Sequence, residues 1–170
     1  NILILCEETK PTGEFMGEYN PPLEYHYKTI YGFHYVIKNL SNREIVLDIV
    51  KLWDIKEGIT LSDGEADIYF DKKATKITDL DNDNIAEVSL GYRILPDVTD
   101  CCWPHAIKLI MHEESKKYAI RGSTSVVFEN EVLGGDKNMY GRNSFKGAPK
   151  VFIDFASNLY DSVLMRHQEW

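Results

Sequence analysis

Residues 106–127 read AIKLIMHEESKKYAIRGSTSVV and contain the clearest strand-turn-strand pattern of the chain. Apolar and polar side chains alternate over residues 106–112, which is the period of a half-buried antiparallel strand. A polar stretch at residues 113–116 has turn chemistry, and residues 118–127 again have the composition of a strand. The pattern therefore predicts a β-hairpin. One face of its first strand consists of Ile107, Leu109 and Met111, and the other carries Lys108 and His112.

Similar segments, rich in β-branched and aromatic residues, recur along the chain and are separated by short polar turns. We expect further strands at residues 2–8, 31–38, 44–53, 76–79 and 86–95. The strands at 31–38 and 44–53 flank an Asn/Ser-rich turn and are expected to pair as a second hairpin. The glycine-rich stretch at residues 134–147 is expected to be a surface loop.

Near the C-terminus the hydrophobic period changes from two to that of an amphipathic helix. Pro149 can start this helix without the loss of a hydrogen bond, and Asp154 is expected near the positive end of its dipole. The apolar stripe consists of Phe152, Phe155, Ala156, Leu159 and Val163. We therefore predict a mainly β (α+β) fold, an antiparallel β-meander or sandwich-like sheet with a C-terminal amphipathic helix, in a single domain over residues 1–170.

The composition restricts the classes of partner. The 170 residues include 19 Lys and Arg against 27 Asp and Glu, a formal net charge of −8. This acidity argues against nucleic acids and anionic membrane surfaces, because both require clustered cations. The sequence contains no apolar run near the roughly 20 residues that cross a bilayer, so no transmembrane segment is expected.

Cysteine and histidine offer little chemistry. The three cysteines, Cys6, Cys101 and Cys102, form no CxxC pair and no disulfide framework, although a bridge from Cys6 to one of the other two stays open. The sequence has no zinc-type histidine spacing, and we expect His34 and His112 to be edge or surface residues. No nucleophile motif is present, so no catalytic residue is assigned.

The strongest chemical motif is DLDNDNIAE at residues 79–87, where carboxylates occur at positions 1, 3, 5 and 9. Calcium takes six to eight oxygen ligands, which a tight loop with this spacing can supply. Asn84 occupies the position where such loops usually have glycine, and Asn tolerates the left-handed conformation. The alternative is a solvated Asp/Asn turn that needs no metal. The candidate ligands are the carboxylates of Asp79, Asp81, Asp83 and Glu87 and the backbone carbonyl of Ile85.

Residues 77–88, ITDLDNDNIAEV, resemble the FG-GAP calcium loop of integrins, whose pattern is D-x-D-x-D-G-x-x-D. The wider chain is similar to a family of bacterial proteins labelled "surface polysaccharide biosynthesis protein". That similarity is carried by VSLGYR (88–93), IKLIM (107–111), YAIRG (118–122), the Gly pair at 134–135 and GAPKVFIDFA (147–156), up to Trp170. The loop resemblance implies that the five candidate ligands hold Ca²⁺.

The family resemblance implies a secreted, periplasmic or outer-surface protein whose signal or anchor has been removed, and the first residue, Asn1, agrees with processing. It also implies a glycan or an envelope protein as partner. The leading hypothesis is thus a non-enzymatic cell-envelope domain with a structural calcium loop, linked to surface polysaccharide.

Three alternatives stay open. An envelope glycan-processing enzyme could use acidic residues among the aromatics between Glu14 and Tyr31, and it would require a cleft with two facing carboxyl groups. A protein-interaction or other binding module would instead show a shallow aromatic surface or an exposed apolar patch. A fragment of a β-propeller is the third, although the single copy of the loop counts against it.

Overall fold

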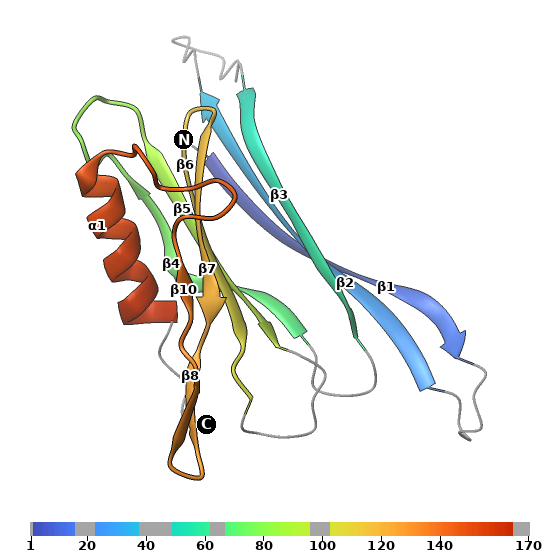
Figure 1. Ribbon diagram of the computed structural model, residues 1–170. Helices are drawn as coiled ribbons and strands as arrows, with labels where there is room; N and C mark the ends of the chain where they lie inside the picture. Colours follow the sequence, from blue (N-terminus) through green and yellow to red (C-terminus); the bar gives the residue numbers. More distant parts are fainter. Residues whose placement is uncertain (1, 16–22, 38–48, 62–66, 96–102, 165–170) are drawn as a thin grey trace.

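The computed structural model describes residues 2–15, 23–37, 49–61, 67–95 and 103–164, which form a mainly β fold (Figure 1). The described strands form three antiparallel sheets. The N-terminal sheet contains β1 (Ile2–Phe15), β2 (Leu23–Ile37) and β3 (Ile49–Leu61). The central sheet has the order β10-β7-β6-β5-β4 and contains β4 (Asp67–Thr78), β5 (Glu87–Leu95), β6 (Ala106–Glu113), β7 (Lys116–Ser123) and β10 (Lys137–Asn138). A separate hairpin joins β8 (Ser125–Phe128) to β9 (Glu131–Gly134).

The predicted antiparallel meander is confirmed in the central sheet, where consecutive strands pair from β4 to β7. The hairpin predicted from residues 106–127 is present as β6 and β7, with Glu113 opposite Lys116 at its turn. Its second strand ends earlier than expected, because Thr124 separates β7 from β8. The Thr124 N–H donates to the carbonyl of His105 at 2.9 Å, so the chain turns out of the central sheet there. β2 and β3 also pair as predicted, whereas their turn at residues 39–42 lies outside the described residues.

Both faces of the central sheet are covered (Figure 1). The helix side packs the expected apolar face of β6 against the C-terminal helix; its buried residues include Leu109, Met111, Ile120, Phe152 and Ala156. The other side packs against the N-terminal sheet; its buried residues include Ile30, Ile68, Val88, Leu90 and Ile110. A sheet covered on both faces has strands that are buried continuously, and residues 87–93 of β5 are all buried.

This second covered face corrects the expectation that His34 and His112 lie at an edge or on the surface. Their exposed fractions are 1% and 4%. The alternation in β6 correctly separated its two faces, but it could not show that a second sheet covers the polar one. His34 comes from β2 of that second sheet.

The C-terminal helix α1 (Lys150–Leu159) continues into a π-helical turn, η1 (Tyr160–Leu164). Phe152, Ala156 and Leu159 are buried as the helical stripe predicts. Pro149 is the N-cap residue instead of the first helical one. Asp154 lies beyond the first turn, where it pairs with the Lys150 ammonium group.

The glycine-rich stretch at residues 134–147 is not simply a surface loop. Within it, Lys137 and Asn138 pair with β7, and the side chain of Phe145 is 1% exposed in the helix-side core. The local composition predicted irregular backbone throughout. Instead, one part of the stretch pairs with the edge of β7, and another part packs into the helix-side core.

Two further expectations concern the cysteines and the membrane. Cys6 is exposed on β1, whereas Cys101 and Cys102 lie outside the described residues, so the possible bridge lies outside them as well. Among the described helices, none combines the length and the hydrophobicity needed to cross a lipid bilayer.

Candidate metal centre

The candidate site is the connection between β4 and β5. The two strands stay paired up to Thr78 and Glu87, which lie directly opposite each other. The intervening residues reverse the chain with two left-handed residues, Asn82 (φ 61°) and Asn84 (φ 67°). The expectation that Asn84 replaces the usual glycine in this conformation is therefore confirmed.

Aspartate side chains hold the loop backbone. The two carboxylate oxygens of Asp79 accept hydrogen bonds from the N–H groups of Asp83 (3.1 Å) and Asn84 (3.2 Å). Asp83 in turn accepts one from the N–H of Ile85 at 2.7 Å. These are the local side-chain-to-backbone bonds that favour Asp in tight turns. They wrap the loop around its own acidic residues.

The loop brings all four predicted carboxylates together. Asp79, Asp81, Asp83 and Glu87 each offer one oxygen, and these oxygens all lie within 4.8 Å of one another. The three aspartates are exposed and Glu87 is buried, so one side of the cluster faces solvent and the other faces the protein interior. Four carboxylates at this separation repel one another, which a cation would reverse.

Glu87 is the distinctive member of the cluster because its side chain is completely buried. Its Oε2 atom accepts hydrogen bonds from the Leu80 N–H (2.8 Å) and from the Thr78 hydroxyl (3.1 Å). Its Oε1 atom is also buried and has no hydrogen-bond partner within the part of the chain that the structure describes. Burial raises the pKa of Glu87, the two hydrogen bonds oppose that rise, and the nearby charge of Asp81 adds to it. A buried carboxylate oxygen without a partner is costly, and a metal ion would satisfy it.

The sequence prediction missed Thr78 and the N–H of Leu80, which orient Glu87. The strand register contained the signal, since Thr78 is the residue opposite Glu87 in an antiparallel pair that closes at the loop. The carbonyl of Ile85, the fifth predicted ligand, stays a prediction.

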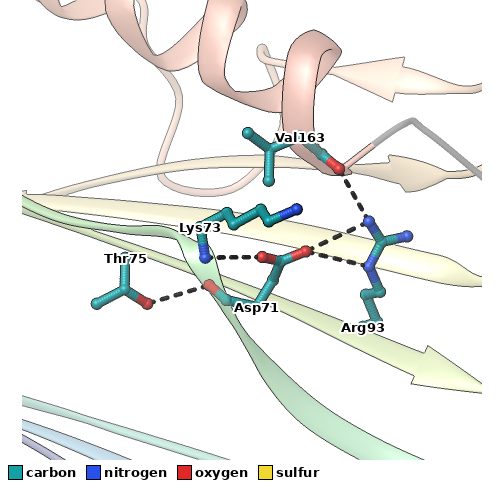
Figure 2. A network of polar contacts seen from close by, with 5 residues as sticks. All are labelled: Asp71, Lys73, Thr75, Arg93 and Val163. Atoms are coloured by element: carbon teal, nitrogen blue, oxygen red, sulfur yellow. Dashed lines mark hydrogen bonds and ion pairs between the residues drawn. The ribbon is translucent and has the colours of Figure 1, made fainter. Parts of the chain in front are cut away.

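A second polar cluster is buried beside the central sheet (Figure 2). The guanidinium of Arg93, whose side chain is 3% exposed, pairs with Asp71 at 3.3 Å and donates to the Val163 carbonyl at 2.9 Å. Asp71 also accepts a hydrogen bond from the Lys73 N–H at 2.9 Å, where the register of β4 shifts. These contacts connect β4, β5 and η1, so the cluster has a structural role.

The described residues contain a shallow hollow of about 190 Å³ on the central sheet, and no carboxylate lines it. It is lined by Ile94, Ala106, Ile107, Lys108, Arg121 and Gly122. This hollow therefore lacks the facing carboxyl groups of a glycan-processing enzyme. The alternative hypothesis used acidic side chains between Glu14 and Tyr31, and all of them, Glu14, Glu18 and Glu24, are outside the set of side chains that the structure describes.

Comparison with known proteins finds no matching family model, no matching curated protein and no matching solved structure. Function is therefore inferred from the acidic cluster and the fold.

Proposed function

We propose that the loop between β4 and β5 is a calcium centre that stabilises a non-enzymatic β module. The observation that carries the proposal is the buried Glu87 carboxylate, whose Oε1 atom has no hydrogen-bond partner among the described residues, in a cluster with three exposed aspartates. A solvated Asp/Asn turn explains the exposed aspartates, but it gives no reason to bury a fourth carboxylate beside them.

The donor set favours calcium over other common metals. All candidate ligands are oxygens, whereas zinc sites use mainly nitrogen and sulfur. With one oxygen from each carboxylate and the carbonyl of Ile85, the loop supplies five ligands, and water can complete six to eight on the side that faces solvent. Magnesium requires a smaller and stricter octahedron and retains more of its own water.

A bound ion would join the end of β4 to the start of β5. It would also position Leu80, which packs against the helix-side core from within the loop. Neutralising two of the four charges changes the formal net charge from −8 to −6. The expected role is therefore stabilisation of this end of the central sheet.

The same proposal places the module at the cell envelope, as a secreted, periplasmic or outer-surface protein associated with surface polysaccharide or an envelope protein. Its support is the resemblance of the sequence to the surface polysaccharide family, and the acidic surface agrees with a partner other than nucleic acid.

Thermal unfolding in excess calcium, in excess magnesium and in chelator tests the metal. Calcium at 100 times its dissociation constant adds about 2.7 kcal/mol to the free energy of unfolding. The gain should disappear in Asp81→Ala, which removes a ligand oxygen, and persist in Asp136→Ala, which removes an exposed carboxylate outside the cluster. Identical unfolding curves in calcium and chelator would contradict the proposal.

A further inference from the structure

The two faces of β2 have different surroundings. Ile30 and His34 point toward the central sheet and are 0% and 1% exposed. Side chains on alternate positions point to opposite faces of a strand, so Tyr31, Phe33 and Tyr35 lie on the outer face. On neighbouring β1 the alternation is the same: Leu3 and Leu5 pack toward the central sheet, while Ile4 and Cys6 are exposed.

The aromatic side chains of this outer face of β2 are called the aromatic row: Tyr27, Tyr31, Phe33 and Tyr35. Thr29, which is 4% exposed, lies between Tyr27 and the three consecutive aromatic positions of this face. The rings of Tyr31 and Phe33 are 6.2 Å apart and parallel to within 6°. The rings of Phe33 and Tyr35 are 6.4 Å apart and inclined by 32°. Tyr27, at one end, is 37% exposed, and the other three are half-buried.

Among the described helices and strands, none covers the outer side of the aromatic row (Figure 1). Figure 1 shows the central sheet and α1 on one side of the N-terminal sheet, and no described helix or strand against its other side. The strand register places Ile4 opposite Phe33 and Cys6 opposite Tyr31, so the surface continues onto β1. Ile4 is 44% exposed, which widens the apolar area beside the rings.

Hydrogen-bonding groups border the aromatic row on β1. The Tyr31 hydroxyl donates to the Glu8 carboxylate at 2.9 Å, and the Lys10 ammonium group lies 3.0 Å from the other oxygen of Glu8. The surface therefore combines flat apolar rings with acceptors and donors at their edge. A matching ligand has flat C–H faces surrounded by hydroxyl groups, which is the chemistry of a sugar ring.

We propose that the outer face of the N-terminal sheet binds a neutral saccharide chain, whose sugar rings stack on the aromatic row. The rings of Tyr31, Phe33 and Tyr35 follow one another at nearly equal spacings of 6.2 and 6.4 Å along an extended strand, which suits a repeating polymer. The formal charge of −8 disfavours acidic polymers and also a second copy of this chain, since both would be repelled. The site is separate from the calcium loop and stands whether or not that loop holds a metal.

Native gel electrophoresis in gels that contain a neutral polysaccharide tests the inference. The probes are mixed-linkage β-glucan, galactomannan and dextran, with alginate as the acidic counterpart. We expect at least one neutral polymer to retard the protein and alginate to have no effect. Phe33→Ala should raise the apparent dissociation constant for the polymer, measured from the retardation, about tenfold. This corresponds to the loss of one stacking contact of about 1.4 kcal/mol. Tyr140→Ala, which removes a ring that is 78% exposed outside the row, should leave it unchanged.

Tyr27→Ala keeps the test informative if Phe33→Ala fails to fold, because Tyr27 lies at the more exposed end of the row. The inference is overturned if none of the neutral polymers retards the protein, or if the row variants are retarded like the parent protein. Light scattering gives a third outcome: a dimer that dissociates in the row variants would overturn the inference by showing that a second copy covers this face. Thermal unfolding of the same samples in calcium and in chelator tests the metal proposal separately, so either proposal can fail without the other.

Discussion

Arg93 on β5 and Asp71 on β4 form an ion pair inside the protein, with their nearest atoms 3.3 Å apart and their side chains 3% and 11% exposed. Arg93 also donates to the Val163 carbonyl in η1. One guanidinium thus connects two strands of the central sheet to the end of the C-terminal helix.

Replacement of Arg93 by methionine should be strongly destabilising, because it leaves the Asp71 carboxylate buried without its partner. The expected loss is about 3–5 kcal/mol in the free energy of unfolding, measured by urea denaturation. Lys150→Met serves as the control, since it breaks an exposed pair with Asp154 and should cost less than about 1 kcal/mol. A loss of similar size in both variants would contradict the structural importance of the Arg93–Asp71 pair.

Glu87→Gln should separate the two effects of the acidic cluster. In chelator the variant should unfold at the temperature of the parent protein or above it, because one of four repelling charges is gone. In calcium it should unfold at a lower temperature than the parent, because a ligand carboxylate is lost. Thermal unfolding in both buffers checks this crossover. A variant that is less stable than the parent by the same amount in both buffers would indicate a purely structural role for Glu87.

The buried position of His112 predicts loss of stability in mild acid. Burial, together with the nearby charges of Lys117 and His34, lowers the pKa of His112 to about 3. The unfolded chain, with an ordinary histidine pKa near 6.5, binds the proton first, so stability is complete above that pH and falls as the pH drops toward 3. Between pH 7 and pH 5.5 the parent protein should lose about 1 kcal/mol more than His112→Leu, measured by urea denaturation at each pH. Equal losses would show that His112 is not neutral in the folded state.

Gly122 marks a close contact between β7 and the segment before β10. A Cβ atom at this position would lie 1.7 Å from the Asp136 carbonyl oxygen and 2.4 Å from the Tyr160 hydroxyl. Gly122→Ala should therefore force a backbone shift and cost at least about 1–3 kcal/mol. At Gly141 the nearest atom would be 3.7 Å from the new Cβ, so Gly141→Ala should be close to neutral. Thermal unfolding of the two variants checks the difference, and equal melting temperatures would contradict the contact.

Local patterns predicted the elements that depend on neighbours in the chain. The alternation at residues 106–112 identified the helix-facing residues Leu109 and Met111, and the helical stripe identified Phe152 and Ala156. The acidic motif predicted both the turn between β4 and β5 and the left-handed Asn84. These predictions succeeded because side-chain period and turn chemistry act over a few residues.

Contacts between distant segments account for the differences. His112 is buried because the N-terminal sheet, which contains β2, packs over it. Phe145 is buried because its side chain packs in the helix-side core. The long β1 and β2 strands likewise exceed their predicted lengths because each pairs with a neighbour along its whole described length.

The acidic cluster shows which features follow from the local sequence and which depend on tertiary packing. Spacing along the chain is enough to specify which carboxylates lie in one loop, because alternate positions place them around a single turn. The burial of Glu87 beside three exposed aspartates depends instead on tertiary packing, since the central sheet excludes water from one side of the loop. In the same way, the packing of the two sheets determines which face of β2 is buried and which carries the aromatic row. Periodicity is a property of neighbouring residues, but burial is a property of what packs against them.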